Sequence, residues 1–160
     1  MSDVVIEFTA DPSRCIGVKP DSTEGGFVGP GSPVELRSLT DPVVLNVWNF
    51  NATIGSFILD LTDIPGEKRL AIDFAGGKVA PETPLVVNYY TGALSQRWSL
   101  TIRPGYITSL ANRNLVIDDY FDSLQSNNTI WAFPYNGTQA QRWTVRKLLD
   151  AVAAKAPRYA

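Results

Sequence analysis

Two short segments of the chain are near copies of each other. Residues 96–100 read Gln-Arg-Trp-Ser-Leu, and residues 141–145 read Gln-Arg-Trp-Thr-Val. A weaker third copy, Asn-Val-Trp, occupies residues 46–48, so the three tryptophans lie 50 and 45 residues apart. Matched residues at nearly equal spacing indicate an internal repeat. We therefore expect three related units of about 45–50 residues each.

The similarity between the second and third units continues upstream of these segments. Residues 70–73 (Leu-Ala-Ile-Asp) match residues 115–118 (Leu-Val-Ile-Asp), and each Asp precedes the Gln of its unit by 23 residues. Residues 90–92 (Tyr-Thr-Gly) align with residues 135–137 (Tyr-Asn-Gly). The agreement of several segments at fixed distances makes the repeat a property of the whole unit.

The first unit is more degenerate than the others. Cys-Ile-Gly-Val at residues 15–18 takes the place of the Leu-x-Ile-Asp segment, with Gly17 where the other units have an aspartate. We expect a single domain over residues 1–148, with repeats at 3–52, 53–102 and 103–148. Residues 149–160 are then a C-terminal tail, and the Leu, Ala and Lys content of residues 146–156 favours a short helix.

Within the units, short runs of β-forming residues alternate with Gly, Pro, Asn and Asp. Many runs alternate apolar with polar residues, which suits half-buried strands. A unit this small cannot bury its own apolar face, whereas three units can share one core. The repeated tryptophans are expected to fill that core and not to contact a ligand. The expected strands are residues 3–9, 42–50, 56–61, 70–74, 84–90, 98–103, 106–110, 115–118, 130–133 and 142–148.

Composition excludes several classes of function. Lys and Arg total 14 against 16 Asp and Glu, and the basic residues are scattered, which argues against nucleic acid as a partner. The chain has no histidine, so Ser-His-Asp and Cys-His catalysis and His-based zinc sites are unavailable. No spacing marks a pair of carboxylates for glycoside cleavage. We expect no enzymatic activity and no cofactor.

Cys15 is the only cysteine, so no intrachain disulfide can form, and we expect this side chain to be buried in the core. No stretch of 18 apolar residues is present, so no membrane-spanning helix is expected. The first residues carry neither a basic nor a long apolar segment. The expected location is the cytoplasm, or the exterior after release without a recognisable signal peptide. A homo-oligomer is left open.

The three Gln-x-Trp segments, with Leu-x-Ile-Asp upstream, resemble those of the ricin-B-like (R-type) lectin family of β-trefoils. Residues 105–112 (Gly-Tyr-Ile-Thr-Ser-Leu-Ala-Asn), which lead into residues 115–118, look especially typical of it. The resemblance covers nearly the whole chain; it is strong in the third repeat, good in the second and weak in the first. It implies an all-β, β-trefoil fold in which a repeat can form a shallow sugar pocket.

In the third repeat the resemblance assigns Asp118 as the carboxylate, Phe133 as the stacking ring and Asn136 as the polar loop residue, with Gln141 supporting Asp118. A carboxylate accepts hydroxyl hydrogen bonds strongly, and an aromatic face packs against the apolar side of a pyranose ring. One departure is Ala140, because many family members have Asn immediately before this Gln. A hydrogen bond to the sugar is then missing.

The other two repeats fit the pattern less well. The second has Asp73 and Gln96, but Asn88 stands at the aromatic position, and Tyr90 is the alternative source of a ring. The first repeat has Gly17, Arg37 and Asn46 at the corresponding places, so we expect a structural role for it and no sugar site.

Asp119 and Asp122 lie next to Asp118 in the sequence and raise the hypothesis of a calcium site. We prefer to interpret them as solvated loop acids, and we predict no metal.

Two functions are compatible with these features. The first is a lectin, or a lectin module, that recognises galactose-type glycans through the third repeat, with a contribution of the second repeat left open. The second is a protein-binding β-trefoil, such as a protease inhibitor, that acts through residues 21–31 and 81–84 and has lost its sugar sites. The shared Asp-to-Gln spacing in two repeats favours the lectin.

Overall fold

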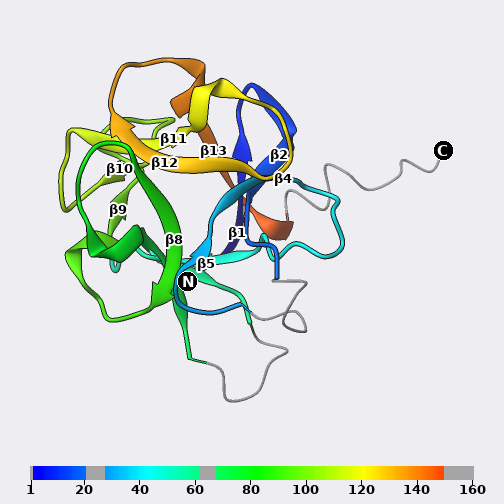
Figure 1. Ribbon diagram of the computed structural model, residues 1–160, viewed down its shortest axis with the longest axis horizontal. Helices are drawn as coiled ribbons and strands as arrows, with labels where there is room; N and C mark the ends of the chain where they lie inside the picture. Colours follow the sequence, from blue (N-terminus) through cyan, green and yellow to red (C-terminus); the bar gives the residue numbers. More distant parts are fainter. Residues whose placement is uncertain (1, 21–27, 62–67, 150–160) are drawn as a thin grey trace.

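The computed structural model describes residues 2–20, 28–61 and 68–149, which form β-strands and short 3₁₀ helices (Figure 1). The strands are β1 (Ser2–Phe8), β2 (Asp11–Gly17), β3 (Ser32–Pro33), β4 (Glu35–Ser38), β5 (Trp48–Phe50), β6 (Phe57–Leu59), β7 (Leu70–Phe74), β8 (Thr83–Tyr89), β9 (Trp98–Ser99), β10 (Thr108–Ser109), β11 (Leu115–Asp119), β12 (Asn128–Pro134) and β13 (Trp143–Lys147). The 3₁₀ helices are η2 (Ala75–Gly77), η3 (Leu94–Gln96), η4 (Tyr120–Asp122) and η5 (Gln139–Gln141).

Apart from β3, the strands fall into three groups of four. The outer strands of the groups pair in a ring: β1 with β13 and β5, β5 with β6, and β9 with β10. Backbone hydrogen bonds from Trp98 to Gly55 (2.7 Å) and from Trp143 to Gly105 (3.0 Å) link the remaining neighbours. The inner strands form the hairpins β2–β4, β7–β8 and β11–β12. The all-β fold with three units is confirmed.

The three hairpins meet at one end of the ring. Strand β12 pairs with β4 and also with β8, so the hairpin of the third unit contacts those of the first and second (Figure 1). The second and third hairpins share one register, since Asp73 lies opposite Val86 and Asp118 lies opposite Trp131. Equivalent residues of the two units therefore occupy equivalent places.

The tryptophans of the Gln-x-Trp segments lie in the core, as predicted, and each is at most 3% exposed. Each indole N–H also donates to the carbonyl of the isoleucine in the Leu-x-Ile segment or its equivalent, which removes the cost of burying the polar indole nitrogen. These bonds join Trp48 to Ile16 (3.1 Å), Trp98 to Ile72 (3.3 Å) and Trp143 to Ile117 (3.0 Å). Cys15 is fully buried, which confirms the prediction for this thiol.

Some strand predictions were wrong. Strands β2, β3 and β4 lie outside the predicted runs, because their sequences are largely polar or contain proline. Within residues 42–50 only β5 is a strand. The chain first turns at Asp41, whose Oδ1 accepts the amide N–H of Val43 (3.1 Å). A short aspartate side chain that bonds the backbone two residues on favours such a turn.

The predicted C-terminal helix does not begin at residue 146. Arg146 and Lys147 belong to β13, where they pair with Val5 and Val4 of β1. An ion pair between Arg146 of β13 and Glu7 of β1 (2.9 Å) links the same two strands. Residues 148 and 149 are helical, and residues 150–156 of the prediction lie outside the described part of the chain.

Candidate functional site

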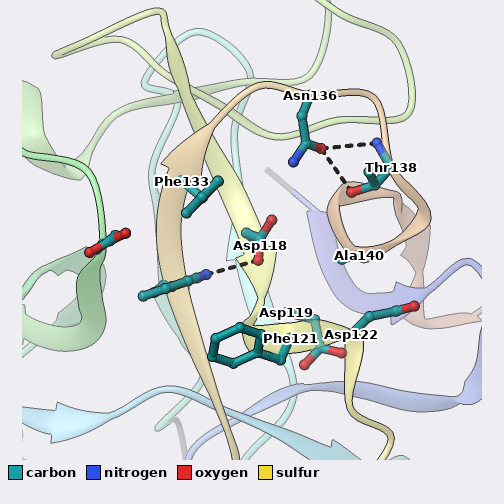
Figure 2. Close-up of a pocket in the computed structure, with 10 residues that line it drawn as sticks. Asp118, Asp119, Phe121, Asp122, Phe133, Asn136, Thr138 and Ala140 are labelled. Carbon is teal, nitrogen blue, oxygen red and sulfur yellow. Dashed lines mark hydrogen bonds between the residues drawn. The ribbon is translucent and has the colours of Figure 1, made fainter.

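A cavity of about 420 Å³ opens beside the β11–β12 hairpin of the third unit. Its walls come from the end of β11, the turn η4, strand β12 and the loop that leads into η5 (Figure 2). The neighbouring second unit adds one residue, Glu82, which immediately precedes β8. The lining residues are Glu82, Asp118, Asp119, Phe121, Asp122, Trp131, Phe133, Asn136, Thr138 and Ala140.

Asp118 is held in this cavity by two hydrogen bonds. The indole Nε1 of Trp131, its partner across the hairpin, donates to Oδ1 (2.8 Å), and Nε2 of Gln141 donates to Oδ2 (2.9 Å). Burial raises the pKa of the Asp118 carboxyl, although the hydrogen bonds from Gln141 and Trp131 oppose the rise. The carboxylate is fixed in place, and each oxygen keeps a further lone pair for another donor.

Gln141, the predicted support of Asp118, is fully buried and does not line the cavity. Besides its bond to Asp118, Nε2 donates to the carbonyl of Pro134 (3.0 Å), and Oε1 accepts the amide N–H of Asn136 (2.9 Å). One side chain thus ties together the carboxylate, the end of β12 and the following loop. Asn136 accepts from both the amide and the hydroxyl of Thr138 at the cavity rim (3.1 and 2.8 Å; Figure 2).

Two stacked rings form the aromatic wall of the cavity. Trp131 and Phe133 have centroids 5.3 Å apart and planes inclined by 26°. Phe133 was predicted as the stacking residue, whereas Trp131 was not considered. The sequence could have indicated Trp131, because side chains two residues apart in a strand point to the same face. Residues 131 and 133 both belong to the predicted strand 130–133.

Phe121 extends this wall from an unfavourable backbone conformation. It has φ of 53°, Asp122 has φ of 54°, and the Phe121 side chain is 78% exposed. The ring lies 6.4 Å from that of Trp131. At the same place in the second hairpin stand Gly76 and Gly77, with φ of 63° and 68°. Left-handed backbone suits glycine and strains a phenylalanine, so the sequence alone could not have revealed this turn.

Asp119 departs from the prediction of a solvated loop acid, whereas Asp122 is exposed as predicted. Asp119 follows Asp118 on β11 and takes the place that Phe74 occupies in the core of the second hairpin. Its Oδ1 accepts from Asn128 (2.7 Å), and its Oδ2 is buried with no hydrogen-bond partner among the described residues. Burial raises the pKa of Asp119 to about 7, and the charges of Asp122 and Asp118 add to the rise.

These acids do not form a recognisable metal centre. Across residues 2–20, 28–61 and 68–149, no group of three or more His, Cys, Asp and Glu side chains could hold a metal ion. The same residues include no helix with the length and apolar character needed to cross a membrane.

In the second unit the carboxylate of Asp73 is occupied by internal partners. Oδ1 accepts the amide N–H of Phe74 (2.7 Å), and Oδ2 accepts from both Asn88 (3.1 Å) and Gln96 (3.2 Å). Asn88, at the position of Phe133, therefore binds the acid instead of offering a ring. The ring of Tyr90 is covered by the guanidinium of Arg69 at 5.0 Å.

The first unit has no space for an acid at the equivalent position. A side-chain Cβ at Gly17 would lie 2.5 Å from Val44 Cγ1, because Val18 and Leu45 form a bridge here. Arg37 forms ion pairs with Glu35 (3.3 Å) and Asp41 (3.0 Å), which are close to it in the sequence. Asn46 stands where the other units have Gln, and its Nδ2 donates to the carbonyl of Leu39 (3.2 Å). This hydrogen bond is equivalent to the one from Gln141 to the carbonyl of Pro134.

The loops considered for a protein-binding function are only partly described. Residues 21–27 lie outside the described part of the chain. Pro81–Pro84 runs into β8, and the amide N–H of Glu82 donates to the carbonyl of Ala132 (2.7 Å). This loop is therefore tied to β12 and brings Glu82 to the cavity.

Comparison with solved structures identifies the architecture. The C-terminal half of an earthworm R-type lectin, solved in complex with GalNAc, matches with a TM-score of 0.67 and 17% identity over 92% of this chain and 99% of that one. The fold is a β-trefoil, which this chain shares with that R-type lectin. The Abrus precatorius agglutinin (TM-score 0.67, 16% identity) matches over 90% of this chain and 48% of its own.

The same β-trefoil also occurs as a part of larger proteins. A mosquitocidal holotoxin matches with a TM-score of 0.69 and 15% identity over 91% of this chain, which spans only 17% of the toxin. No protein-family model matches the chain, and no curated protein matches it. The similarity of this chain to lectins is therefore a similarity of fold alone.

Proposed function

We propose that the chain is a carbohydrate-binding protein that holds a galactose-type sugar in the cavity of its third repeat. The observation that carries the proposal is the placement of Asp118, a carboxylate fixed by two side-chain hydrogen bonds beside the stacked rings of Trp131 and Phe133. The β-trefoil fold shared with R-type lectins supports the same assignment.

Each part of the cavity has a role in this proposal. Asp118 accepts hydrogen bonds from two neighbouring sugar hydroxyls, because each carboxylate oxygen has a lone pair beyond the one already used. Phe133 and Trp131 pack against the apolar C–H face of the ring. Asn136 contributes polar contacts at the rim, and Gln141 keeps Asp118 and the rim loop in register. Ala140 lines the cavity without offering a hydrogen bond, which leaves the sugar with fewer polar contacts.

The second repeat is proposed to contribute little. Asp73 already accepts from Phe74, Asn88 and Gln96, so a sugar hydroxyl would have to compete with these internal donors. This internal network supports a structural role for Asp73 and Gln96. We place the working site in the third repeat.

A glycan-array screen of the wild type, Asp118→Asn and Asp73→Asn tests the proposal. Asp73→Asn is a matched control, because it makes the same chemical change at the equivalent position of another repeat. We expect galactose-terminated glycans to bind the wild type and Asp73→Asn, and to lose about tenfold or more in affinity with Asp118→Asn, since a charge-assisted hydrogen bond is removed. Circular dichroism confirms that all three proteins fold. Absence of binding by a folded wild type would refute the proposal.

A further inference from the structure

We propose that the sugar taken by this cavity carries a free amine, and that it binds as the ammonium form of a hexosamine such as galactosamine. The inference rests on the proposed function and names the chemical class of its ligand. It follows from what lines the cavity: carboxylates and aromatic rings, with no basic side chain among the ten residues.

The charges around the cavity all have one sign. Glu82, Asp118, Asp119 and Asp122 line it, and neither a lysine nor an arginine does. The negative charge of Asp122 raises the pKa of both Asp118 and Asp119, so these acids repel one another. A bound cation relieves this repulsion, and a concave site lined with one sign of charge attracts the opposite one.

A buried oxygen in the wall lacks a donor. Oδ2 of Asp119 has no hydrogen-bond partner among the described residues, although Asp119 is fully buried. An uncompensated buried acceptor is costly, and a ligand with several N–H donors is better suited to satisfy acceptors than a hydroxyl with one. The carboxylate of Asp119 lies near Phe121 and Asp122 in Figure 2.

The aromatic wall favours the same ligand. Trp131 and Phe133 are stacked, and Phe121 continues the surface toward Asp122 (Figure 2). The faces of these rings carry partial negative charge and attract an ammonium group as well as the C–H face of a sugar. A sugar with a carboxylate, by contrast, would meet four acidic side chains.

Isothermal titration calorimetry with three sugars tests the inference. Galactosamine, galactose and N-acetylgalactosamine differ only at one substituent. At about pH 7.5 most of the free amine is charged, because its ordinary pKa is about 8. Most of Asp119 is ionised at the same pH, because its pKa is about 7. We expect galactosamine to bind the wild type about tenfold more tightly than N-acetylgalactosamine, which keeps the nitrogen but loses the charge. Salt should reduce this preference, because it screens charges that are partly exposed.

Two variants and one control test whether acidic side chains of the cavity produce the preference for galactosamine. Asp122→Asn on η4 and Glu82→Gln on the neighbouring unit should each reduce it by about threefold or more, since each removes one charge from the cavity. Asp3→Asn removes one charge from an exposed residue that lines a different cavity with Lys147, and it should leave the preference unchanged.

The possible failures are distinguishable. Equal affinity of the wild type for all three sugars would overturn the inference and leave the proposed function intact. A preference for galactosamine that falls as much in Asp3→Asn as in Asp122→Asn would also overturn it, because the effect would be one of net charge. Failure of all three sugars to bind would overturn both proposals.

Discussion

Phe121 and Gly76 occupy the same position in two copies of one turn. Both have left-handed backbone, with φ of 53° and 63°, and Phe121 exposes most of its ring beside the cavity. A left-handed conformation costs a residue with a Cβ about 1–2 kcal/mol. The third repeat carries this strain where the second avoids it, as expected for a side chain placed for binding.

Phe121→Gly should therefore stabilise the protein and weaken its binding. We expect the free energy of unfolding to rise by about 0.5–1 kcal/mol, because the relief of strain exceeds the added freedom of the unfolded chain. Affinity for sugar should fall, since part of the aromatic wall is lost. Denaturant unfolding and sugar titration measure the two effects.

Gly76→Ala is the reciprocal control for that variant. A Cβ at Gly76 meets nothing within 4 Å, so the change tests backbone strain alone. It should lower the free energy of unfolding by about 1 kcal/mol. If Phe121→Gly destabilises the protein, packing of the ring on Tyr120 outweighs the backbone strain and this account of the turn is wrong.

Asp119 makes stability depend on pH in a direction opposite to that of a salt-bridged acid. Its folded-state pKa is raised to about 7 from 3.8, so between these values the folded protein holds a proton that the unfolded chain has released. The free energy of unfolding must then fall as the pH rises from about 4 to 7. Below this window the proton is bound in both states, and above it in neither.

Asp119→Asn should remove most of this pH dependence. The amide keeps an oxygen to accept from Asn128 and has no charge to desolvate. We expect the variant to be more stable than the wild type by about 4 kcal/mol at neutral pH and above, and similar to it near pH 4, because the pKa rises from 3.8 to about 7. Denaturant unfolding of both proteins across this range is the measurement. Parallel pH profiles would contradict the assignment of the shift to Asp119.

At the scale of elements, the hairpins β7–β8 and β11–β12 are each braced by a Gln from the 3₁₀ helix that follows, η3 and η5 respectively. Gln96 and Gln141 each bond the aspartate of their unit, the carbonyl at the end of the hairpin and an amide of the next loop. The bonds of Gln96 are to Asp73 (3.2 Å), Tyr89 (2.9 Å) and Thr91 (3.0 Å). Both side chains are buried, so their loss leaves unsatisfied polar groups.

Gln96→Ala and Gln141→Ala should each lower the free energy of unfolding by about 2–4 kcal/mol. Only Gln141→Ala should also weaken sugar binding, because only Asp118 faces the working cavity. The two variants are compared by denaturant unfolding and by titration under conditions where both are folded. Equal loss of binding in both would point to a second working site at Asp73.

At the scale of the whole molecule, the repeat was sufficient to predict three units around one core, and the resemblance to R-type lectins implied the β-trefoil. The three tryptophans at regular spacing place three indoles in a shared core, and this required no knowledge of individual strand ends. Strands β2, β3 and β4 were not predicted, because pairing with neighbouring strands holds them in place despite their polar sequences. Such long-range pairing leaves no local pattern.

The candidate site was only partly predictable for a similar reason. The resemblance to R-type lectins assigned Asp118, Phe133, Asn136 and Gln141, because these positions are fixed within the repeated unit. It could not show that Asn88 saturates Asp73, since that bond depends on how two strands face each other. Nor could it find Glu82, which reaches the cavity from another unit.

The indole N–H signals of the four tryptophans offer the most direct test of the central claim, a single sugar site at Asp118. Trp48, Trp98 and Trp143 donate to backbone carbonyls in the core, whereas Trp131 donates to Asp118 in the cavity. NMR titration with galactose, with the Trp131 signal assigned by Trp131→Phe, should shift that signal alone and saturate. Four unmoved signals at saturating sugar, or shifts at Trp98 matching those at Trp131, would contradict the claim.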